Sequence, residues 1–160
     1  MQWPCRTLED PGTSILHVSR FSTPDGLAKF FAVEYRESPE LPDKEYPFFL
    51  TTGRLLFHFH TGTMTRRSTI AKYINEPYVE INPKDAQELG IKDGDEIYVV
   101  SRRGRVKSKA KVTEKVPERT VFSTFHFFET PINELTLADP LDPVAKIPNF
   151  KVSAVRIEKA

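Results

Sequence analysis

Proline sets the strongest limit on how this chain can fold, because thirteen prolines are spread along its 160 residues. Proline has no backbone N–H and breaks the interior of a helix, and an average chain contains only about 5% of it. Long helices are therefore disfavoured, and many short elements joined by turns are expected. With 39% hydrophobic and 28% charged residues, the composition is that of a globular chain and not of a disordered one.

The charge balance and the cysteine count argue against several classes of protein. Lysine and arginine total 23 and aspartate and glutamate 22, whereas binders of nucleic acids or membrane surfaces depend on a strong basic excess. No window approaches the ~18 apolar residues of a membrane span, and the opening residues lack the segments of a secretory signal. A single cysteine, Cys5, excludes an intrachain disulfide. We therefore expect a cytoplasmic protein that contacts neither nucleic acid nor membrane.

The first 45 residues are expected to form an irregular N-terminal arm. Short strands are predicted at Ile15–His17 and at Lys29–Tyr35, where alternate residues share a face. The stretch 36–45 carries two prolines and four acidic residues, which predicts a solvated linker. The arm, residues 1–45, ends with this linker, and a main body, residues 46–160, follows it.

The main body has the pattern of a small barrel. Asn82 and Pro83 are typical of a helix cap and first turn, and predict one helix that ends at Gly90. A second short helix is expected at Thr69–Asn75. Strands are predicted at Phe48–Thr52, Tyr78–Ile81, Glu96–Ser101, Val106–Val112, Thr120–Phe125 and Ser153–Glu158. A chain that is mainly β with short helices favours a closed or nearly closed β barrel.

The polar stretch Thr51–Ser68 is the first candidate binding segment. It combines hydroxyl groups, two glycines, two histidines and the arginines Arg54, Arg66 and Arg67. Glycine lets backbone N–H groups approach an anion, and arginine adds bidentate contacts to phosphate. This composition fits an anionic, polyfunctional ligand, although an ordinary solvated loop is polar as well. No phosphate-binding fingerprint such as GxGxxG or GxxxxGK[ST] names the ligand.

Three histidines raise the alternative of a metal site. His58 and His60 have the spacing of one strand face, and His126 is a possible third ligand of a small zinc enzyme. No cysteine or carboxylate lies close enough in the sequence to complete such a ligand set. Nor does the sequence show residues that would hydrogen-bond the other ring nitrogens of metal-binding histidines. Histidines that hydrogen-bond a ligand or a carbonyl are therefore favoured over zinc ligands, and no catalytic triad is indicated by spacing.

The stretch Thr124–Thr136 is the second candidate binding segment, because it places polar groups among aromatic ones. The aromatic residues fit a core better than a cofactor platform. Asn133 and Glu134 need hydrogen-bond partners among apolar neighbours, and a purine or a pterin would supply them. A further mixed cluster lies at Lys146–Lys151.

Six basic residues between Arg102 and Lys111 form a basic hairpin. We interpret it as the solvent-exposed face of an edge strand, where lysines discourage aggregation. The alternative is an adaptor module that contacts nucleic acid or protein through this hairpin. Nucleic-acid binding would also need interleaved aromatic residues, which the hairpin lacks.

Motifs in the same order along the chain resemble the molybdopterin-dinucleotide-binding domain of formate dehydrogenases, in the molybdopterin oxidoreductase family. The matching stretches are Tyr46–Arg54, His58–Ser68, Tyr78–Pro83, Asp85–Ala86, Leu89–Asp95, Phe125–Glu129, Asn133–Thr136, Leu141–Pro143 and Lys146–Lys151. The arm, through Phe21–Phe30, resembles the region just upstream in the catalytic subunit. The ordered set covers nearly the whole chain.

The resemblance implies a double-psi β barrel and a bis-(molybdopterin guanine dinucleotide) cofactor that holds molybdenum or tungsten. In that family this domain closes over the cofactor from one side. Thr63 and Arg66 would reach toward a pyrophosphate, and Asn133 and Thr136 would approach the pterin or the guanine. The implied cofactor-binding residues are Arg54, Leu55, Leu56, His58, His60, Thr61, Thr63, Arg66, His126, Asn133 and Thr136, with Phe150 and Lys151 at the closing rim.

The resemblance also implies which functions lie elsewhere. The family's catalytic cysteine or selenocysteine, its adjacent histidine and its iron–sulfur ligands belong to earlier domains, so no catalytic residue is expected in this chain. The whole enzyme would oxidise formate to carbon dioxide, with the cofactor carrying the chemistry. The expected partners are the remainder of the catalytic subunit and its iron–sulfur electron-transfer subunits. The chain alone is not expected to oxidise formate.

Overall fold

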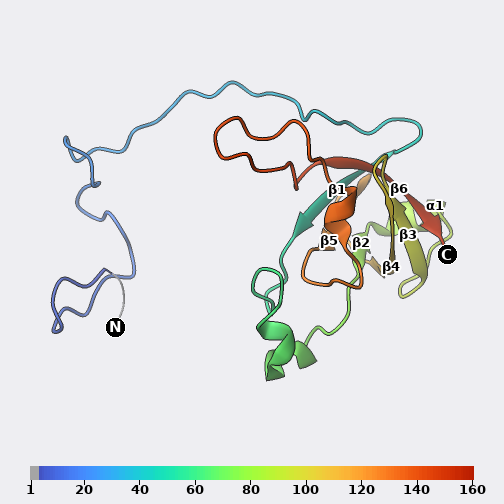
Figure 1. Ribbon diagram of the computed structural model, residues 1–160, viewed down its shortest axis with the longest axis horizontal. Helices are drawn as coiled ribbons and strands as arrows, with labels where there is room; N and C mark the ends of the chain where they lie inside the picture. Colours follow the sequence, from blue (N-terminus) through green and yellow to red (C-terminus); the bar gives the residue numbers. More distant parts are fainter. Residues whose placement is uncertain (1–3) are drawn as a thin grey trace. The chain divides into compact units, whose positions relative to one another are not determined.

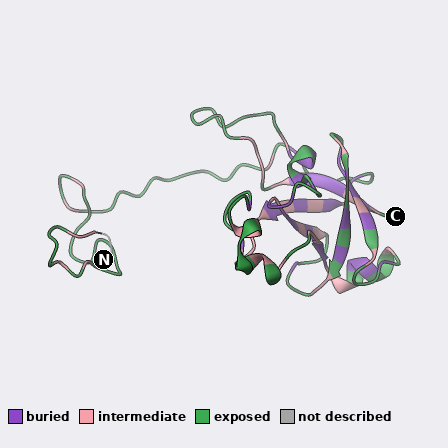
Figure 2. Ribbon diagram, turned by 60° about the horizontal axis from the view of Figure 1, so that its bottom comes forward, coloured by how far each residue is buried: buried purple, intermediate pink, exposed green. Residues whose placement is uncertain are grey.

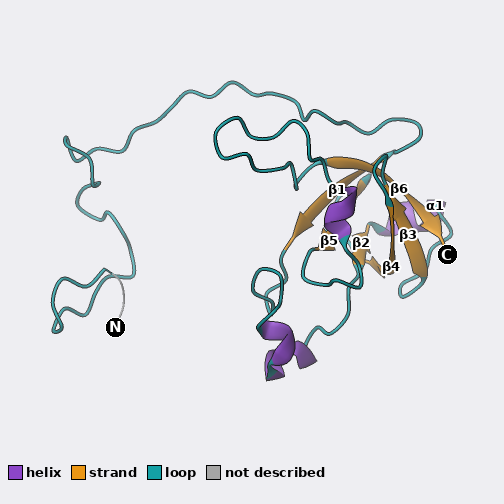
Figure 3. Ribbon diagram, in the orientation of Figure 1, coloured by secondary structure: helices purple, strands orange, loops and turns teal. Residues whose placement is uncertain are grey.

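The computed structural model describes residues 4–160 and divides the chain into two units, Met1–Arg36 and Glu37–Ala160. In the first unit no described residue is buried, and none lies in a helix or strand (Figures 2 and 3). The strands predicted at Ile15–His17 and Lys29–Tyr35 are therefore absent from this structure. A strand needs a neighbouring strand for its backbone groups, and neither segment has one among the described residues.

The described residues of the second unit form a closed barrel of six strands, which are labelled in Figure 1. The order around the barrel is β1-β5-β2-β4-β3-β6. The prediction of a mainly β chain with short helices is confirmed. The strands are β1 (Phe48–Gly53), β2 (Val79–Ile81), β3 (Glu96–Val100), β4 (Arg105–Val112), β5 (Thr120–Thr124) and β6 (Ser153–Lys159).

Alternating side chains decide which face of each strand points into the barrel. In β4, Val106, Ser108 and Ala110 are buried, while the intervening Lys107 and Lys109 are exposed. This confirms the period-two pattern seen in the sequence. The expectation that the strand forms a sheet edge is wrong, because β4 pairs with β2 on one side and β3 on the other.

One α-helix and three short 3₁₀ helices join the strands in the described part of the chain. The side chain of Asn82 caps α1 (Pro83–Glu88) by accepting from the backbone N–H of Lys84, as the sequence predicts. The helix expected at Thr69–Asn75 is only the 3₁₀ helix η2 (Thr69–Lys72). The other two are η1 (Thr65–Arg67) and η3 (Ile132–Leu135).

Glu40 corrects the prediction of a solvated acidic linker, because its side chain is only 8% exposed. Its Oε2 atom accepts from Arg103 Nη2 at 2.7 Å and from the backbone N–H of Ala154 at 2.9 Å. Its Oε1 atom accepts from Arg102 Nη1 at 2.7 Å and from Arg103 Nη1 at 3.0 Å. The linker is thus fastened to the β3–β4 turn and to β6.

The electrostatics of Glu40 favour its charged form. Burial alone would raise the pKa of the carboxyl, but hydrogen bonds from Arg103, Ala154 and Arg102 together lower it. Arg103 also donates from Nε to the carbonyl of Leu135 at 3.0 Å. One guanidinium therefore connects the linker, the barrel and the end of η3.

Among the described residues, no helix combines the length and the apolar character needed to cross a membrane.

We predict that Glu40→Gln lowers the free energy of unfolding by about 2 kcal/mol or more, because it removes a buried charge from two guanidinium groups. Chemical denaturation monitored by far-ultraviolet circular dichroism measures the change in the free energy of unfolding. Glu114→Gln is the matched control, because Glu114 is exposed and no hydrogen bond or ion pair joins it to a described residue. Equal stability of the two variants would contradict the role given to Glu40.

Candidate functional site

Parallel pairing of β1 with β5 brings the two candidate binding segments to one end of the barrel. The register places Gly53 opposite Thr124, at the last residues of the two strands. Both chains therefore leave the barrel side by side in the same direction. A Cβ atom at Gly53 would lie 2.7 Å from Cε2 of Phe122, so a larger residue there would force that ring to move.

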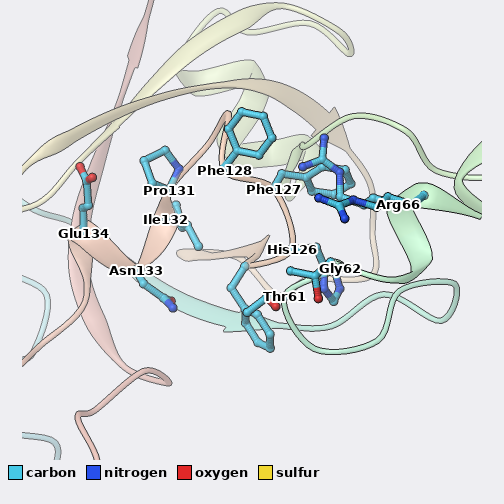
Figure 4. Close-up of a pocket in the computed structure, with 13 residues that line it drawn as sticks. Thr61, Gly62, Arg66, His126, Phe127, Phe128, Pro131, Ile132, Asn133 and Glu134 are labelled. Carbon is cyan, nitrogen blue, oxygen red and sulfur yellow. The ribbon is translucent and has the colours of Figure 1, made fainter.

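The two segments enclose a cavity of about 620 Å³, shown in Figure 4. Arg66 lies at one side of the opening, and Asn133 and Glu134 lie at the other. The wall is mixed, with arginines, hydroxyls, an amide and a carboxylate set among aromatic rings. The lining residues are Thr61, Gly62, Thr63, Arg66, Arg67, Phe125, His126, Phe127, Phe128, Pro131, Ile132, Asn133 and Glu134.

His126 joins the two segments. The backbone N–H of Leu55 donates to Nε2 of His126 at 2.8 Å, and the opposite ring nitrogen, Nδ1, contacts the carbonyl oxygen of His60. Since Nε2 accepts a hydrogen bond, the proton resides on Nδ1, and the ring is neutral. Burial lowers the pKa of His126, and the neighbouring His58 and Arg54 lower it further, although the bond to His60 opposes them.

His58 is buried behind this contact and supports the first segment from within. Its Nε2 lies 2.7 Å from the carbonyl oxygen of Ile74, so this nitrogen carries the proton. Its Nδ1 lies 3.0 Å from the hydroxyl of Thr65, which donates to it. The ring packs edge-on against Phe127 at a centroid distance of 5.4 Å. His58 therefore shapes the loop and does not face the cavity.

Arg66 is held in place from three sides. Its guanidinium carbon lies 4.9 Å from the ring centroid of Phe127 and 5.0 Å from that of Phe128. Its Nη2 atom donates to Glu129 at 2.5 Å, and this hydrogen bond lowers the pKa of the glutamate carboxyl. Gly62 has a φ of +74°, and a Cβ atom there would lie 3.1 Å from the Arg66 stem. The cation is thus positioned before any anion binds.

Asn133 and Glu134 are presented by η3, which two buried apolar residues anchor. Ile132 and Leu135 are 1% and 0% exposed, so the polar pair between them is turned outward. The hydroxyl of Thr136 donates to the carbonyl of Asn133 at 2.8 Å and closes the turn. Asn133 and Glu134 keep their side-chain groups available to a ligand, because both are exposed.

The structure brings five of the predicted site residues to the cavity wall and leaves the others around it. Thr61, Thr63, Arg66, His126 and Asn133 line the cavity. Away from the wall, Arg54, Leu56 and His60 are exposed, whereas His58 and Thr136 are buried. Leu55 donates its backbone N–H to His126. Phe150 and Lys151 hold the end of β1.

Phe150 and Lys151 are tied to Thr52, the penultimate residue of β1. The Thr52 hydroxyl donates to the carbonyl of Phe150 at 2.7 Å. In return, Lys151 Nζ donates to the carbonyl of Thr52 at 2.6 Å. The final loop is therefore fixed beside the point where the first binding segment begins.

Several lining residues were not predicted as ligands. Phe125, Phe127 and Phe128 were expected to be core, and the structure divides them, because Phe127 is buried and Phe128 is 80% exposed. An exposed phenylalanine beside an arginine indicates a surface on which a flat ligand can stack. This signal becomes visible only once the fold is known. Gly62, Pro131 and Ile132 also line the cavity without a predicted role, whereas Arg67 and Glu134 belong to the polar groups that the sequence analysis singled out.

The histidine geometry disagrees with the zinc alternative. His58 and His60 do not share a strand face, because β1 ends at Gly53 and both lie in the loop beyond it. Both ring nitrogens of His58 and of His126 already have protein partners. Within residues 4–160, no group of three or more His, Cys, Asp or Glu side chains is placed to hold a metal ion.

The basic hairpin is largely neutralised by neighbouring acids. Lys107 pairs with Glu96 at 2.9 Å, and Lys109 pairs with Glu76 at 2.5 Å. Arg102 and Arg103 both pair with Glu40. A surface whose cations already have partners offers little net charge to a phosphate backbone.

Comparison with known protein families agrees with the cavity chemistry. The family model described as "Molydopterin dinucleotide binding domain" matches residues 48–154, which include β1 to β5 and the first two residues of β6. The chain belongs to this family. Membership makes residues 48–154 a molybdopterin-dinucleotide-binding domain.

Relatives extend the similarity beyond the family domain. The chain is 52% identical over 160 residues to the F420-dependent formate dehydrogenase subunit alpha of Methanocaldococcus jannaschii, a match covering 99% of this chain and 24% of that protein. It is 36% identical over 162 residues to formate dehydrogenase H of Escherichia coli, covering 99% of this chain and 22% of that protein. The chain thus spans about a quarter of the length of these relatives.

A solved structure shows the same fold. Acetylene hydratase from Pelobacter acetylenicus superposes with a TM-score of 0.62 at 23% sequence identity, covering 72% of this chain and 18% of that one.

We predict that acidification loosens the cavity through His126. The lowered pKa means that the folded chain resists protonation, so this group's contribution to stability is complete above the ordinary value of 6.5 and is lost as the pH falls through the lower folded value. Denaturant unfolding between about pH 7 and pH 4.5 measures the decline.

Two variants isolate the histidine's share of this pH dependence. His126→Gln, which cannot titrate, is expected to lose part of the decline and to be less stable at pH 7 by about 1–3 kcal/mol, because the Leu55 and His60 backbone groups lose their partner. His17→Gln, in the exposed arm, is expected to behave as the parent chain. An unchanged pH profile in His126→Gln would contradict the proposed contact.

Proposed function

We propose that this chain is the cofactor-binding part of a formate dehydrogenase, and that it holds a bis-(molybdopterin guanine dinucleotide) containing molybdenum or tungsten. The observation that carries the proposal is the single cavity formed by two segments distant in sequence, with a fixed arginine on one side and an amide and a carboxylate on the other. The formate dehydrogenases at 52% and 36% identity support the reaction.

The arginine side of the cavity suits the phosphate groups. Arg66 and Arg67 supply guanidinium donors, and Thr61 and Thr63 add exposed hydroxyls to the same wall. Glu129 holds Arg66 but takes only part of its five N–H donors, so the remaining donors are free to bind a pyrophosphate. The donor set therefore fits the anionic middle of a dinucleotide.

The other side suits a pterin or a guanine ring. Both rings present a carbonyl acceptor next to N–H and amino donors along one edge. The Asn133 amide can donate to the acceptor and accept from the donors of such an edge, and Glu134, which points away from Asn133 in Figure 4, can accept from a further donor of the ligand. The exposed ring of Phe128 adds an apolar surface against which a flat heterocycle can stack.

The remaining predicted residues would act at the edges of the bound cofactor. Arg54, Leu56 and His60 are exposed on the first segment, where they would contact the cofactor or the polypeptide that covers it. Leu55, His58 and Thr136 would act indirectly, by holding the segments in shape. Phe150 and Lys151 would form the closing rim.

This division of labour gives the chain binding and orientation but not bond cleavage. When bound, the metal of the cofactor would accept the two electrons released as formate becomes carbon dioxide and a proton. The residues of this chain would neutralise the phosphates, orient the heterocycle and exclude water from one side. The residues that contact formate, and the iron–sulfur centres that remove the electrons, would belong to the rest of the catalytic subunit and its partner subunits.

Three finer assignments accompany the proposal. The two parallel strand pairs, β1 with β5 and β2 with β4, support a double-psi arrangement of the barrel. Residues 46–160 would form the cofactor-binding domain, and residues 1–45 would lie outside it. A cytoplasmic enzyme without nucleic-acid or membrane contacts fits the near-zero charge.

We predict that guanosine diphosphate, as a fragment of the cofactor, binds this cavity. Nuclear magnetic resonance titration of the chain should shift amide signals within residues 54–67 and 125–136. Arg66→Gln should weaken binding by about tenfold or more, because a charge-assisted contact to phosphate is lost.

Arg105→Gln is the matched control, since Arg105 lies on the barrel wall and pairs with Glu158. It should bind as the parent chain does. Shifts confined to the basic hairpin, or equal binding by the two variants, would show that the nucleotide is recognised elsewhere.

A further inference from the structure

The segment Lys29–Tyr35 exposes aromatic and branched side chains to an unusual degree. Phe30 is 97% exposed, Phe31 81%, Val33 86% and Tyr35 87%. Aromatic side chains bury about 150–250 Å² each when covered, so the three here account for about 450–750 Å². This approaches the ~800 Å² that each partner contributes to a standard protein interface. An exposed apolar surface of this size is typical of a segment that binds another polypeptide surface.

The backbone of the same segment is also without partners. The preceding turn is ordered, because the N–H of Phe21 donates to the carbonyl of Gly26 at 2.9 Å. From residue 28 to residue 38, in contrast, no backbone hydrogen bond joins the segment to a described residue. A run of unpaired N–H and C=O groups is what the edge of a β-sheet can accept as a new strand.

The side-chain pattern favours a strand over other docked conformations. Phe31, Val33 and Tyr35 share one face of an extended chain, and Phe30 and Ala32 share the other. Aromatic and β-branched residues are those that strands prefer. Since both faces carry apolar groups, the segment fits a strand covered on both sides.

The comparisons indicate what polypeptide could supply the sheet. The matched family domain begins only at residue 48, whereas the relative from Methanocaldococcus jannaschii matches 99% of this chain. The relative therefore has a counterpart of the arm within its longer polypeptide, and the arm lies outside the residues that match the family domain. This chain covers only 24% of the relative, so about three quarters of its length remains to provide a covering surface.

We propose that Lys29–Tyr35 is a β-strand added to the edge of a sheet in the remainder of a longer catalytic subunit. The strand would fasten the cofactor-binding barrel to that remainder by backbone hydrogen bonds and by aromatic side chains on two faces. The proposal rests on the arm and on the length of the relative, and it does not depend on which cofactor the barrel binds.

The test compares this chain alone with the same chain inside a full-length subunit. The full-length alpha subunit of Methanocaldococcus jannaschii is expressed with its matching segment replaced by these 160 residues. Amide hydrogen exchange should be fast for residues 29–35 in the chain alone and slower by about tenfold or more at alternate residues in the full-length protein. Equally fast exchange in both overturns the proposal.

Proline variants distinguish backbone pairing from side-chain packing alone. Successive N–H groups of a strand point in opposite directions, so either Val33→Pro or Glu34→Pro must remove a hydrogen bond to the sheet. At least one of the two should abolish the protection, while Val33→Ala and Glu34→Ala retain it. If both proline variants behave like their alanine controls, the segment does not dock as a strand.

Three further measurements complete the test. If the full-length subunit that carries all 160 residues does not fold, a second chimera that carries only residues 1–36 of this chain replaces it. Sedimentation of the chain alone should show a monomer, and self-association that protects residues 29–35 would overturn the choice of partner. Guanosine diphosphate binding is measured on the parent chain and on the Val33 and Glu34 variants. Failure of the parent chain to bind the nucleotide would count against the proposed function while leaving the strand proposal intact.

Discussion

The site depends on the parallel pairing of β1 with β5. Strands that run in the same direction end at the same edge, so pairing Gly53 with Thr124 makes residues 54 and 125 start their loops together. An antiparallel pair would have sent the loops to opposite ends of the barrel. Parallel neighbours need a long crossover, and here the crossover contains β2, α1, β3 and β4. Most of the fold therefore separates two short segments in sequence while joining them in space.

Two buried polar contacts then stiffen what the strand pairing has brought together. His126 satisfies backbone groups on the facing loop, and its neutral form follows from the donor and acceptor it meets. Glu40 fixes Arg103, which in turn donates to the carbonyl of Leu135 beneath the Asn133–Glu134 turn. Both contacts place a polar group where losing its partner would leave an orphaned donor or acceptor. If the cavity holds the proposed cofactor, its binding and the stability of the barrel are coupled through the same few residues.

The sequence predicted the strands well but only part of the site. Period-two alternation, seen most clearly in β4, depends on local contrast between neighbours, and so does the Asn82 cap. The burial of Glu40 could not be predicted, because its partners lie some 60 and 114 positions away. His126 has no local signal for the contact it makes with Leu55 and His60. The strand expected at Lys29–Tyr35 has the right side chains, but no pairing partner is present among the described residues.

Photochemical labelling tests the shared cavity most directly. An azide-bearing guanosine diphosphate is bound to the chain, irradiated, and the modified peptides are identified by mass spectrometry. A cavity built from both loops predicts labels in residues 54–68 and in residues 125–136 of the same preparation, suppressed by excess unmodified nucleotide. Labels on one loop only, or on α1 and the outer face of β4, would contradict a common binding wall.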